Sequence, residues 1–518
     1  VYTPLEVVDF IIRSINDVLE SEFGQTLGSK GVHIMDPFTG TGTFITRLLQ
    51  SGLITKEQML HKFRHELHAN EIVLLAYYIA SINIEATFSS LMDGTYEPFE
   101  GICLTDTFRL NEAHDLIGST LEDNNKRIKK QKTLDIRVIM GNPPYSVGQK
   151  SENDNNDNVE YPALDERIRG TYAKQSRAVL SKGLYDSYIR AIRWASDRIE
   201  NCGVLGFVTN AGFLESNTAD GLRKCLAEEF SSIHVFHLRG NQRTTGETSK
   251  REGGQTFGSG SRAPIAISIL VKNPAAKEQG RILFHDIGDY LTREQKLKKV
   301  EELVSIKGLT DTGLWQNITP DEHGDWLRQR DDSFGQFMPI GVKKGAETPL
   351  FSRFSLGVVT ARDSWCWNFS KAGLEENLKS LIGVYTSELV RFNQEYLGAD
   401  KKTKEEAVSE FITSDATKIS WSRALKQDLS RDKGLIYSEN CRIHGVYRPF
   451  TRQWLYFDRR LNEMVYQMPR LFPKGKADNL IICAKVRVPD DGFFVTMASN
   501  IFDFQPDGGS HCFPLFVY

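Results

Sequence analysis

Residues 32–44 read VHIMDPFTGTGTF, and this stretch decides the fold expected for the first half of the chain. Its first four residues are a short apolar strand, and a glycine-containing loop follows directly before the next helix. Gly40 and Gly42 let the backbone turn tightly and approach a ligand closely at a helix N-terminus. This order is typical of a nucleotide-binding βα unit, although a βα turn without a ligand has the same pattern.

Strand-like and helical patterns alternate through the first 275 residues. Apolar residues recur at helical spacing over residues 5–19, and further strands are predicted at residues 138–140, 203–208 and 265–271. The alternation predicts the α/β class, with a Rossmann-like, doubly wound and mostly parallel sheet. Ligands of such sheets bind at the carboxyl ends of the strands, where the glycine loop falls.

Three segments are predicted along the chain. Residues 1–275 form the α/β domain, residues 276–347 form a connector with a charged helix, and residues 348–518 form a separate α+β domain that is richer in aromatic residues. The chain opens without Met and closes on an apolar run, which is unusual for a natural terminus. We expect the chain to be a piece of a longer polypeptide, incomplete at its C-terminus.

The overall composition excludes several classes of protein. The 518 residues include 64 Lys+Arg and 67 Asp+Glu, so the net charge of -3 gives no sign of nucleic-acid binding. Seven cysteines without a CxxC pair argue against a disulfide framework and a cysteine zinc site, and they favour the cytoplasm. The apolar run at residues 72–80 is about half as long as a membrane span, and the first residues lack a secretory signal pattern.

The sequence Asn142-Pro143-Pro144-Tyr145 carries the strongest chemical signal in the chain. Methylation of an aromatic amine is difficult because the nitrogen lone pair is delocalised into the ring. The Asn142 amide oxygen and a carbonyl fixed by the consecutive prolines are acceptors that can hold the N–H groups and direct the lone pair. Tyr145 offers a flat face on which a base can stack. The alternative is a Pro-Pro turn that merely ends a strand.

Asp36 adds a chemical detail to the glycine loop. A carboxylate at this position would repel a phosphate, but it suits an ammonium group such as that of S-adenosylmethionine. The sequence contains no GxxxxGK[ST], which excludes a P-loop ATPase within it.

With these two motifs in this order, residues 1–275 resemble a gamma-class DNA amino-methyltransferase, which has the class I methyltransferase fold and uses S-adenosylmethionine. The resemblance implies that Glu71 binds the ribose hydroxyls of the cofactor and that Asp106 accepts a hydrogen bond from its adenine amine. Phe257 falls where the family places a second aromatic ring against a flipped base. The remaining implied cofactor contacts are Tyr2, Thr3, Asp36, Phe38, Thr39, Gly40 and Gly42.

Residues 184–195, 285–290 and 447–450 resemble the modification part of type ISP restriction–modification enzymes, which combine their activities on one polypeptide. In that family a nuclease and a helicase-like ATPase precede the methyltransferase. Neither is found in this sequence, in agreement with the expectation of a longer parent protein. The resemblance implies double-stranded DNA as a partner, covalently linked nuclease and ATPase domains, and no membrane.

Positive charge gathers late in the chain. Residues 441–487 contain ten Lys and Arg residues against three acidic ones, a local charge of +7, with seven Phe, Tyr and Trp residues interleaved. Such a stretch suits phosphate contacts on a duplex, although a solvated basic face over a buried aromatic one has the same pattern. The predicted DNA contacts are Arg448, Arg452, Arg459, Arg460 and Arg470, together with Arg362, which follows residues 358–361.

Two further patterns do not carry a function. His61, His65 and His68 have the spacing of one helix face, but no carboxylate or thiol completes a zinc site, so we expect no metal. Asp286 with Glu294-Gln295-Lys296 imitates a nuclease signature, but the second part is predicted to lie on an exposed helix rather than on a strand.

The sequence therefore predicts a site-specific DNA methyltransferase that flips an adenine out of the duplex and methylates its N6, as the modification module of a restriction–modification enzyme. Cytosine N4 poses the same chemical problem, and the motif order favours adenine. Two alternatives remain. One is a methyltransferase acting on a protein glutamine or an RNA base, and the other is a catalytically silent DNA-binding specificity subunit.

Overall fold

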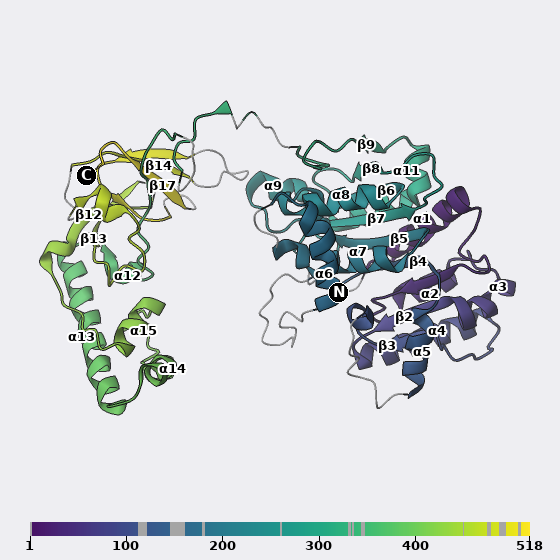
Figure 1. The fold of residues 1–518 in the computed structure, drawn as a ribbon, viewed down its shortest axis with the longest axis horizontal. Helices are drawn as coiled ribbons and strands as arrows, with labels where there is room; N and C mark the ends of the chain where they lie inside the picture. The colour runs from purple at the N-terminus through teal and green to yellow at the C-terminus, as the bar shows by residue number, and fades with distance from the viewer. Residues whose placement is uncertain are drawn as a thin grey trace. The chain divides into compact units, whose positions relative to one another are not determined.

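The structure is a computed structural model, and it divides into two compact units, Val1–Asp331 and Asp332–Tyr518 (Figure 1). It describes residues 3–111, 122–145, 161–178, 182–258, 262–329, 333, 336–342, 348–448, 450–473, 478–485, 494–505 and 509–517. Tyr2, one of the implied cofactor contacts, lies outside the described residues.

A nine-stranded sheet forms the centre of the first unit, with the strand order β3-β2-β1-β4-β5-β7-β6-β8-β9. In Figure 1 this order runs from β3 at the bottom of the unit to β9 at the top. The strands from β3 to β5 pair in parallel, and β7 is antiparallel to both of its neighbours. The strands are β1 (His33–Asp36), β2 (Leu67–Glu71), β3 (Ile102–Leu104), β4 (Ile136–Gly141), β5 (Gly203–Asn210), β6 (Ser232–Arg239), β7 (Ile265–Lys272), β8 (Arg281–Asp286) and β9 (Gln316–Ile318).

Helices cover both faces of this sheet, because successive side chains of a buried strand point to opposite faces. In β1, Ile34 packs in one apolar core with α1, α2 and α4, whereas Met35 packs in the other core with α7 and α8. This arrangement confirms the predicted doubly wound α/β class. The helices are α1 (Leu5–Phe23), α2 (Thr43–Gln50), α3 (Lys56–His61), α4 (Leu74–Leu91), α5 (Glu122–Lys132), α6 (Pro162–Ile168), α7 (Ser187–Arg198), α8 (Asp220–Glu229), α9 (Gly246–Glu252), α10 (Arg293–Leu303) and α11 (Ile306–Asp311).

The segment predicted as a connector is for the most part integral to the first unit. β8 pairs in parallel with β6, and β9 extends the sheet by one more strand. Helices α10 and α11 pack on α1, where the Ile306 amide donates to the Ser14 hydroxyl over 3.0 Å. The exterior of α10 is charged, and for this reason the segment was predicted to be a connector. On its other side, Leu297 and Val300 are buried against the core.

The second unit is built from two small sheets and a group of helices, in agreement with the predicted α+β character. One sheet has the order β10-β17-β14-β15 and the other has the order β11-β13-β12-β16. Its helices are α12 (Asp363–Cys366), α13 (Lys371–Glu395), α14 (Lys401–Phe411), α15 (Arg423–Ser430) and α16 (Met468–Leu471). Its strands are β10 (Ser355–Leu356), β11 (Trp367–Asn368), β12 (Arg442–Tyr447), β13 (Thr451–Tyr456), β14 (Ile481–Lys485), β15 (Val495–Ala498), β16 (Ile501–Phe502) and β17 (Ser510–Pro514).

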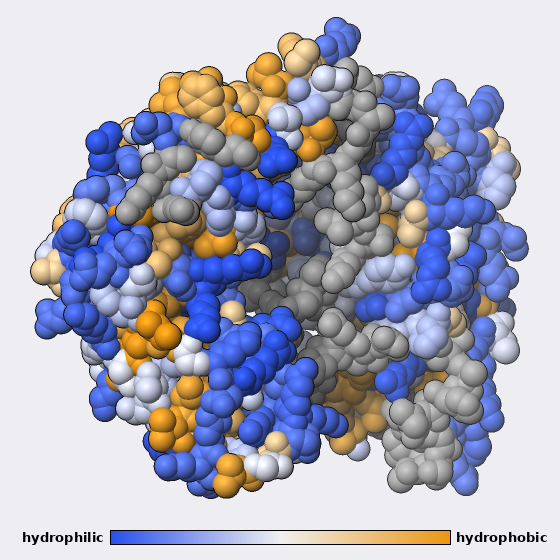
Figure 2. All heavy atoms as spheres, turned by 60° about the vertical axis from the view of Figure 1, so that its left-hand side comes forward, coloured by the Kyte–Doolittle hydropathy of each residue, from blue (hydrophilic) through white to orange (hydrophobic). Residues whose placement is uncertain are grey.

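Hydrophobic surface is scattered rather than continuous on the face drawn in Figure 2, where hydrophobic residues form small groups among hydrophilic ones. Within the described part of the chain, no helix combines the length and the apolar character that crossing a membrane requires.

Candidate active site

The glycine loop joins the carboxyl end of β1 to α2. Gly40 and Gly42 both adopt left-handed backbone angles, with φ of 57° and 90°. A Cβ atom on Gly42 would also lie 3.2 Å from the side chain of Ile84 in α4. Both the left-handed backbone and this close contact therefore favour glycine at position 42. Glu71 fixes the loop from the end of β2, because its two carboxylate oxygens accept the Gly40 amide over 2.8 Å and the Val73 amide over 2.7 Å.

Asp36 is fully buried at the end of β1, and its carboxylate is only partly satisfied. Oδ1 accepts the Phe38 amide over 3.1 Å, whereas Oδ2 has no hydrogen-bond partner among the described residues. Burial raises the pKa of this carboxyl to about 8, and the nearby Glu71 adds to the rise. A buried carboxylate oxygen without a partner is costly, so this atom is suited to a cationic ligand group.

Gly141, the last residue of β4, brings the two sequence motifs together. A Cβ atom at this position would lie 2.8 Å from Asp36 Oδ1, which is closer than real Cβ contacts allow. Glycine before Asn142 therefore lets the Asn-Pro-Pro-Tyr loop lie directly against the buried carboxylate. Sequence analysis missed this residue, because its requirement for glycine arises from a neighbouring strand and not from its own turn.

Asn142 is held from the N-terminal segment of the chain. Its Nδ2 donates to the Thr3 hydroxyl over 2.9 Å, across 139 residues of sequence. Its Oδ1 lies 2.5 Å from the Tyr145 hydroxyl, which also lies 3.1 Å from the Val208 carbonyl oxygen at the end of β5. The hydroxyl has one hydrogen and can donate it to only one of these acceptors. Burial raises the pKa of Tyr145 far above its usual range, so the phenol keeps this proton.

Phe257 lies beside Tyr145, as the family resemblance implies. The ring centroids are 6.4 Å apart and the ring planes are 30° from parallel. Two stacking intervals of about 3.4 Å each, the rise between bases in DNA, add up to nearly this separation. Phe257 is buried, and residues 259–261 after it lie outside the described part of the chain. The pair is therefore spaced close to what a flat ring between them would need.

Asp106 follows β3 and faces the same edge of the sheet. Its Oδ1 accepts the Phe108 amide over 3.0 Å, and its Oδ2 accepts the Tyr161 hydroxyl over 3.0 Å. Burial raises the pKa of this carboxyl, while the Tyr161 bond acts in the opposite direction. Phe108 and Phe38 pack with ring centroids 5.4 Å apart, so they form an apolar wall next to the carboxyl group.

A framework of hydrogen bonds aligns these loops, and no sequence pattern predicted it. The Thr39 amide donates to the Asn70 carbonyl over 3.0 Å, and the Thr107 hydroxyl donates to the Pro37 carbonyl over 2.6 Å. The ends of β1, β2 and β3 are thereby tied to one another. Ile72, directly after Glu71, is 61% exposed and offers an apolar surface at this edge.

The predicted DNA contacts separate into distinct groups. Arg362 is 3% exposed, and its guanidinium donates to the carbonyls of Leu461 and Ser420 and to the Ser422 hydroxyl, so it is a structural residue of the second unit. Arg448 is paired with Asp363 and Asp503, and Arg460 donates to the Gly434 carbonyl. Arg452, Arg459 and Arg470 are exposed. Lys474, Lys476 and Arg487 of the same stretch lie outside the described residues.

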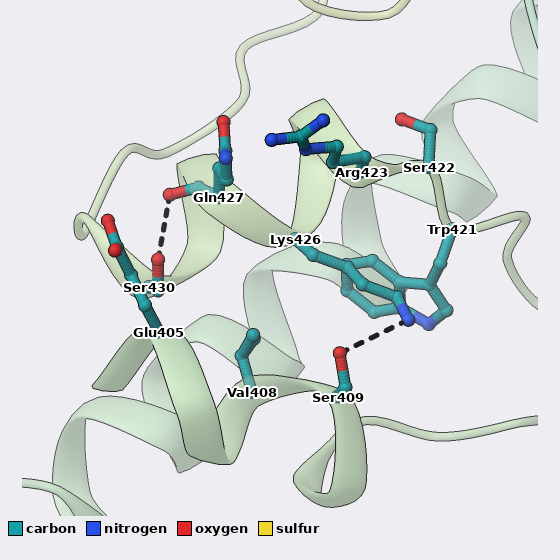
Figure 3. A pocket seen from close by; sticks show the side chains of 9 residues that line it. All are labelled: Glu405, Val408, Ser409, Trp421, Ser422, Arg423, Lys426, Gln427 and Ser430. Carbon is teal, nitrogen blue, oxygen red and sulfur yellow. Dashed lines mark hydrogen bonds between the residues drawn. The ribbon is translucent and has the colours of Figure 1, made fainter. Parts of the chain in front are cut away.

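Two cations outside the predicted stretch line a cavity of about 400 Å³ between α14 and α15 (Figure 3). Arg423 and Lys426 come from the first turn of α15, and Lys426 reaches across to the Ser409 hydroxyl over 3.4 Å. Trp421 forms part of the wall and Glu405 is the acidic group. Sequence analysis missed these cations because they lie before residue 441, where acidic residues balance the local charge.

The histidine spacing does not correspond to one helix face. His61 ends α3, His65 lies in a π-helical turn over Lys62–Glu66, and His68 lies in β2. His68 is buried with its Nε2 3.0 Å from His33 Nδ1. The acidic signature near residue 290 is divided between structural contacts: Asp286 pairs with Arg239, and Lys296, on helix α10, is buried and donates to the Glu252 and Gly254 carbonyls.

Comparisons with known proteins identify both halves of the chain. Residues 56–243 match the family described as Eco57I restriction-modification methylase, and residues 349–518 match the Type ISP C-terminal specificity domain. Across its whole length the chain is also similar to the Type ISP restriction-modification enzyme LlaGI, at 44% identity with a TM-score of 0.79. Residues 349–518 form a Type ISP C-terminal specificity domain. Together with the methylase match in the first unit and the similarity to LlaGI, this domain confirms the resemblance drawn from the sequence.

Two other solved structures match the complete chain. The ATP-dependent enzyme LlaBIII, solved bound to DNA, is 41% identical with a TM-score of 0.79, and DrdV, solved as a DNA complex, is 35% identical with a TM-score of 0.80. The chain spans 42% of the LlaGI chain, 34% of LlaBIII and 49% of DrdV. None of the curated protein sequences compared with the chain matches it.

Proposed function

We propose that this Type ISP module is a site-specific DNA methyltransferase that transfers the methyl group of S-adenosylmethionine to adenine N6. The observation that carries the proposal is the position of Asn142, which Thr3 holds beside the buried Asp36 carboxylate at the carboxyl ends of β1 and β4. An acceptor for an amine and an acceptor for a cofactor ammonium are thereby adjacent in one site.

The residues present fit S-adenosylmethionine, whose sulfonium supplies an activated methyl group when the cofactor is bound. The unpartnered Oδ2 of Asp36 is placed for its ammonium, and the half-buried Thr3 for its carboxylate. Glu71 and the exposed Ile72 face the edge where a ribose and an adenine would lie, and Asp106 offers an acceptor next to the Phe38 and Phe108 rings. A Cβ atom on Gly40 would meet nothing within 4 Å, so the space next to this residue is open.

Asn142 and Tyr145 must separate before a base is bound. In this structure the Tyr145 hydroxyl lies against Asn142 Oδ1, the acceptor that would hold the target N6. Rotation of Tyr145 frees that oxygen and presents the phenol ring to a base entering opposite Phe257. Asn142 Oδ1 and the Pro143 carbonyl then accept the two N6 hydrogens and direct the lone pair at the methyl carbon. The new N–C bond forms as the methyl–sulfur bond breaks, and N6 afterwards loses one proton to solvent.

Extrusion of the base costs a few kcal/mol, which stacking of about 1–3 kcal/mol per base and the hydrogen bonds to Asn142 offset. Both the LlaBIII and the DrdV structures contain DNA, and we propose double-stranded DNA as the partner here as well. Arg452, Arg459 and Arg470 are the exposed candidates for its phosphates, with Arg423 and Lys426 beside the α14–α15 cavity. Linked nuclease and ATPase domains are the further partners that we propose.

Transfer of a radiolabelled methyl group tests this function. We expect label in duplex DNA carrying adenine, and labelling about 10²–10³-fold slower after Asn142→Ala. Label in protein or RNA would support the rival methyltransferase, and label nowhere would support a silent specificity subunit. Mapping modified bases after expression in an unmethylated host separates adenine N6 from cytosine N4 and reads out the recognition site together with the strand.

A further inference from the structure

The first unit has a cavity near the amino ends of β2 and β3, whereas the candidate active site lies at the carboxyl ends of the strands. It measures about 140 Å³, and its walls come from the segment before β2, the start of β3 and one side of α5, where Lys126 and Lys130 are exposed and Gln131 is buried. His68 in its wall is three residues before Glu71 on β2, so roughly 10 Å of strand separates the cavity from the cofactor edge. The volume equals about four to five waters in the liquid.

The walls of this cavity are strongly basic. Four Lys and Arg residues and two histidines line it, against the single carboxylate of Glu100. Arg64 is paired with Glu97 and Lys126 is paired with Asp123. Arg127 and Lys130 form no salt bridge with any residue in the described ranges, and Arg127 Nη2 donates only to the Tyr77 hydroxyl over 3.3 Å. Two cations of α5 therefore face the cavity without a neutralising carboxylate.

The titration of the neighbouring groups is consistent with a positive potential there. The pKa of His68 is lowered to about 3, first by burial and then by the charges of His33, Lys130, Arg198 and Lys62. Burial raises the pKa of the Cys103 thiol to about 12 although Arg127 acts against this rise, so the thiol stays protonated and supplies no counter-charge. Neither His68 nor Cys103 therefore supplies a negative charge to Arg127 and Lys130.

Gln131 is the feature that marks a built site. It is 4% exposed and lines the cavity, yet neither its Nε2 nor its Oε1 has a hydrogen-bond partner among the described residues. The Nε of Arg127 is likewise buried without a partner. Buried donors and acceptors without partners are rare in folded proteins, and each one calls for a ligand or an ordered water. A ligand that satisfies Gln131 must offer both an acceptor oxygen and a hydroxyl donor.

We propose that this cavity is a non-catalytic binding site for a small oxyanion of the phosphate class, held by Arg127, Lys130 and Gln131. A phosphate monoester or inorganic phosphate carries three or four oxygens, one of them protonated in part near neutral pH, which matches both atoms of the Gln131 amide. The cavity is large enough for the head of such a group. The ligand is either free phosphate or the terminal phosphate of a nucleic acid.

Calorimetric titration of the chain with sodium phosphate at constant ionic strength tests the site. We expect saturable binding that Lys130→Gln weakens at least tenfold. Lys129→Gln is the matched control, because it removes the same charge from an exposed position of α5 outside the cavity wall, and it should change the affinity less than twofold. Absence of saturable binding, or equal weakening by both variants, would overturn the proposal.

A second variant separates binding from folding. Gln131→Leu removes two buried polar atoms that lack partners, so without phosphate the unfolding temperature should stay equal or rise, while phosphate affinity falls. Unchanged phosphate affinity in this variant would refute the role of Gln131. Competition by a 5′-phosphorylated oligonucleotide but not by its unphosphorylated counterpart assigns the ligand to a terminal phosphate, and competition by neither assigns it to free phosphate. Competition by both shows surface binding of the DNA backbone and contradicts the site. None of these readouts depends on methyl transfer.

Discussion

The glycine and Asn-Pro-Pro-Tyr loops differ from the basic stretch of the second unit in how far their chemistry can be traced from local sequence. In the loops, the local backbone sets the course of the chain: a strand ends, glycines turn, and prolines stiffen it, and distant Thr3 and Glu71 then hold Asn142 and Gly40 in place. In the basic stretch, whether a cation is free to contact DNA depends on acidic partners that are distant in the sequence. Arg442 is paired with Glu375, which is 67 residues away, and Arg448 is paired with Asp363. Counting charges locally cannot reveal such pairing.

The largest effect that we expect lies at Asp36, and it tests whether the loops depend on burial as well as on backbone. Its pKa of about 8 in the folded chain exceeds the ordinary value of 3.8. A raised carboxyl pKa lowers the stability progressively as pH rises from the ordinary pKa toward 8, because folding must then take up a proton that the unfolded state has already lost. From pH 5 to pH 8 this amounts to about 4 kcal/mol.

Urea unfolding of the cofactor-free chain measures this effect. The stability advantage of Asp36→Asn over the natural chain should grow by about 4 kcal/mol between pH 5 and pH 8. The amide is the matched control for shape, since it keeps the hydrogen bond to the Phe38 amide and cannot titrate. If the free energies of unfolding of the two proteins change equally with pH, ionisation of Asp36 does not destabilise the fold.

The second effect concerns Asn142. Replacement by Ala removes the side-chain acceptor for the target amine, and loss of one such preorganised group costs about 10²–10³ in turnover. Cofactor affinity should change far less, which equilibrium dialysis with labelled cofactor can check. If turnover and cofactor affinity fall in parallel, Asn142 contributes to cofactor binding through Thr3. The cofactor would then depend on the Asn-Pro-Pro-Tyr loop as well as on the glycine loop.

Much of this site could be predicted because its determinants are local. The strand preceding Asp36, the two glycines and the Asn-Pro-Pro-Tyr sequence each define their own geometry. The contributions of Gly141, Asn70 and Thr107 could not be predicted, since they depend on which strands become neighbours in the sheet. The connector was misjudged for a related reason: the short strand β9 has only three residues, and α10 shows few apolar side chains. Pairing and packing, not local pattern, include them in the first unit.

The third effect concerns Tyr145, whose ring and hydroxyl have separable roles. Tyr145→Ala removes a stacking surface of about 1–3 kcal/mol, so turnover should fall by about 5–150-fold while cofactor affinity stays near normal. Tyr145→Phe keeps the ring and removes the hydroxyl that lies against Asn142, so it should lose less activity than the Ala variant. Steady-state rates on duplex DNA measure both, and a base-mispaired target should partly rescue the Ala variant because extrusion then costs less. Equal losses in Ala and Phe variants would contradict stacking.

The smallest effect returns to the basic stretch, where exposure and not charge count should decide the outcome. Arg459→Gln with Arg460→Gln should weaken DNA binding about tenfold and reduce the slope of log affinity against log salt by about 1–2, since each phosphate contact releases counterions. Lys401→Gln with Lys402→Gln on α14 is the matched double control, and it should leave the slope unchanged.

Arg442→Gln should lower the unfolding temperature without changing the slope, because its side chain is 8% exposed and already paired. If Arg442→Gln alters the salt slope as much as the exposed pair does, the local count of charges predicts DNA contacts better than exposure does. If only the exposed pair alters it, recognition in the second unit depends on the few cations that folding leaves without acidic partners.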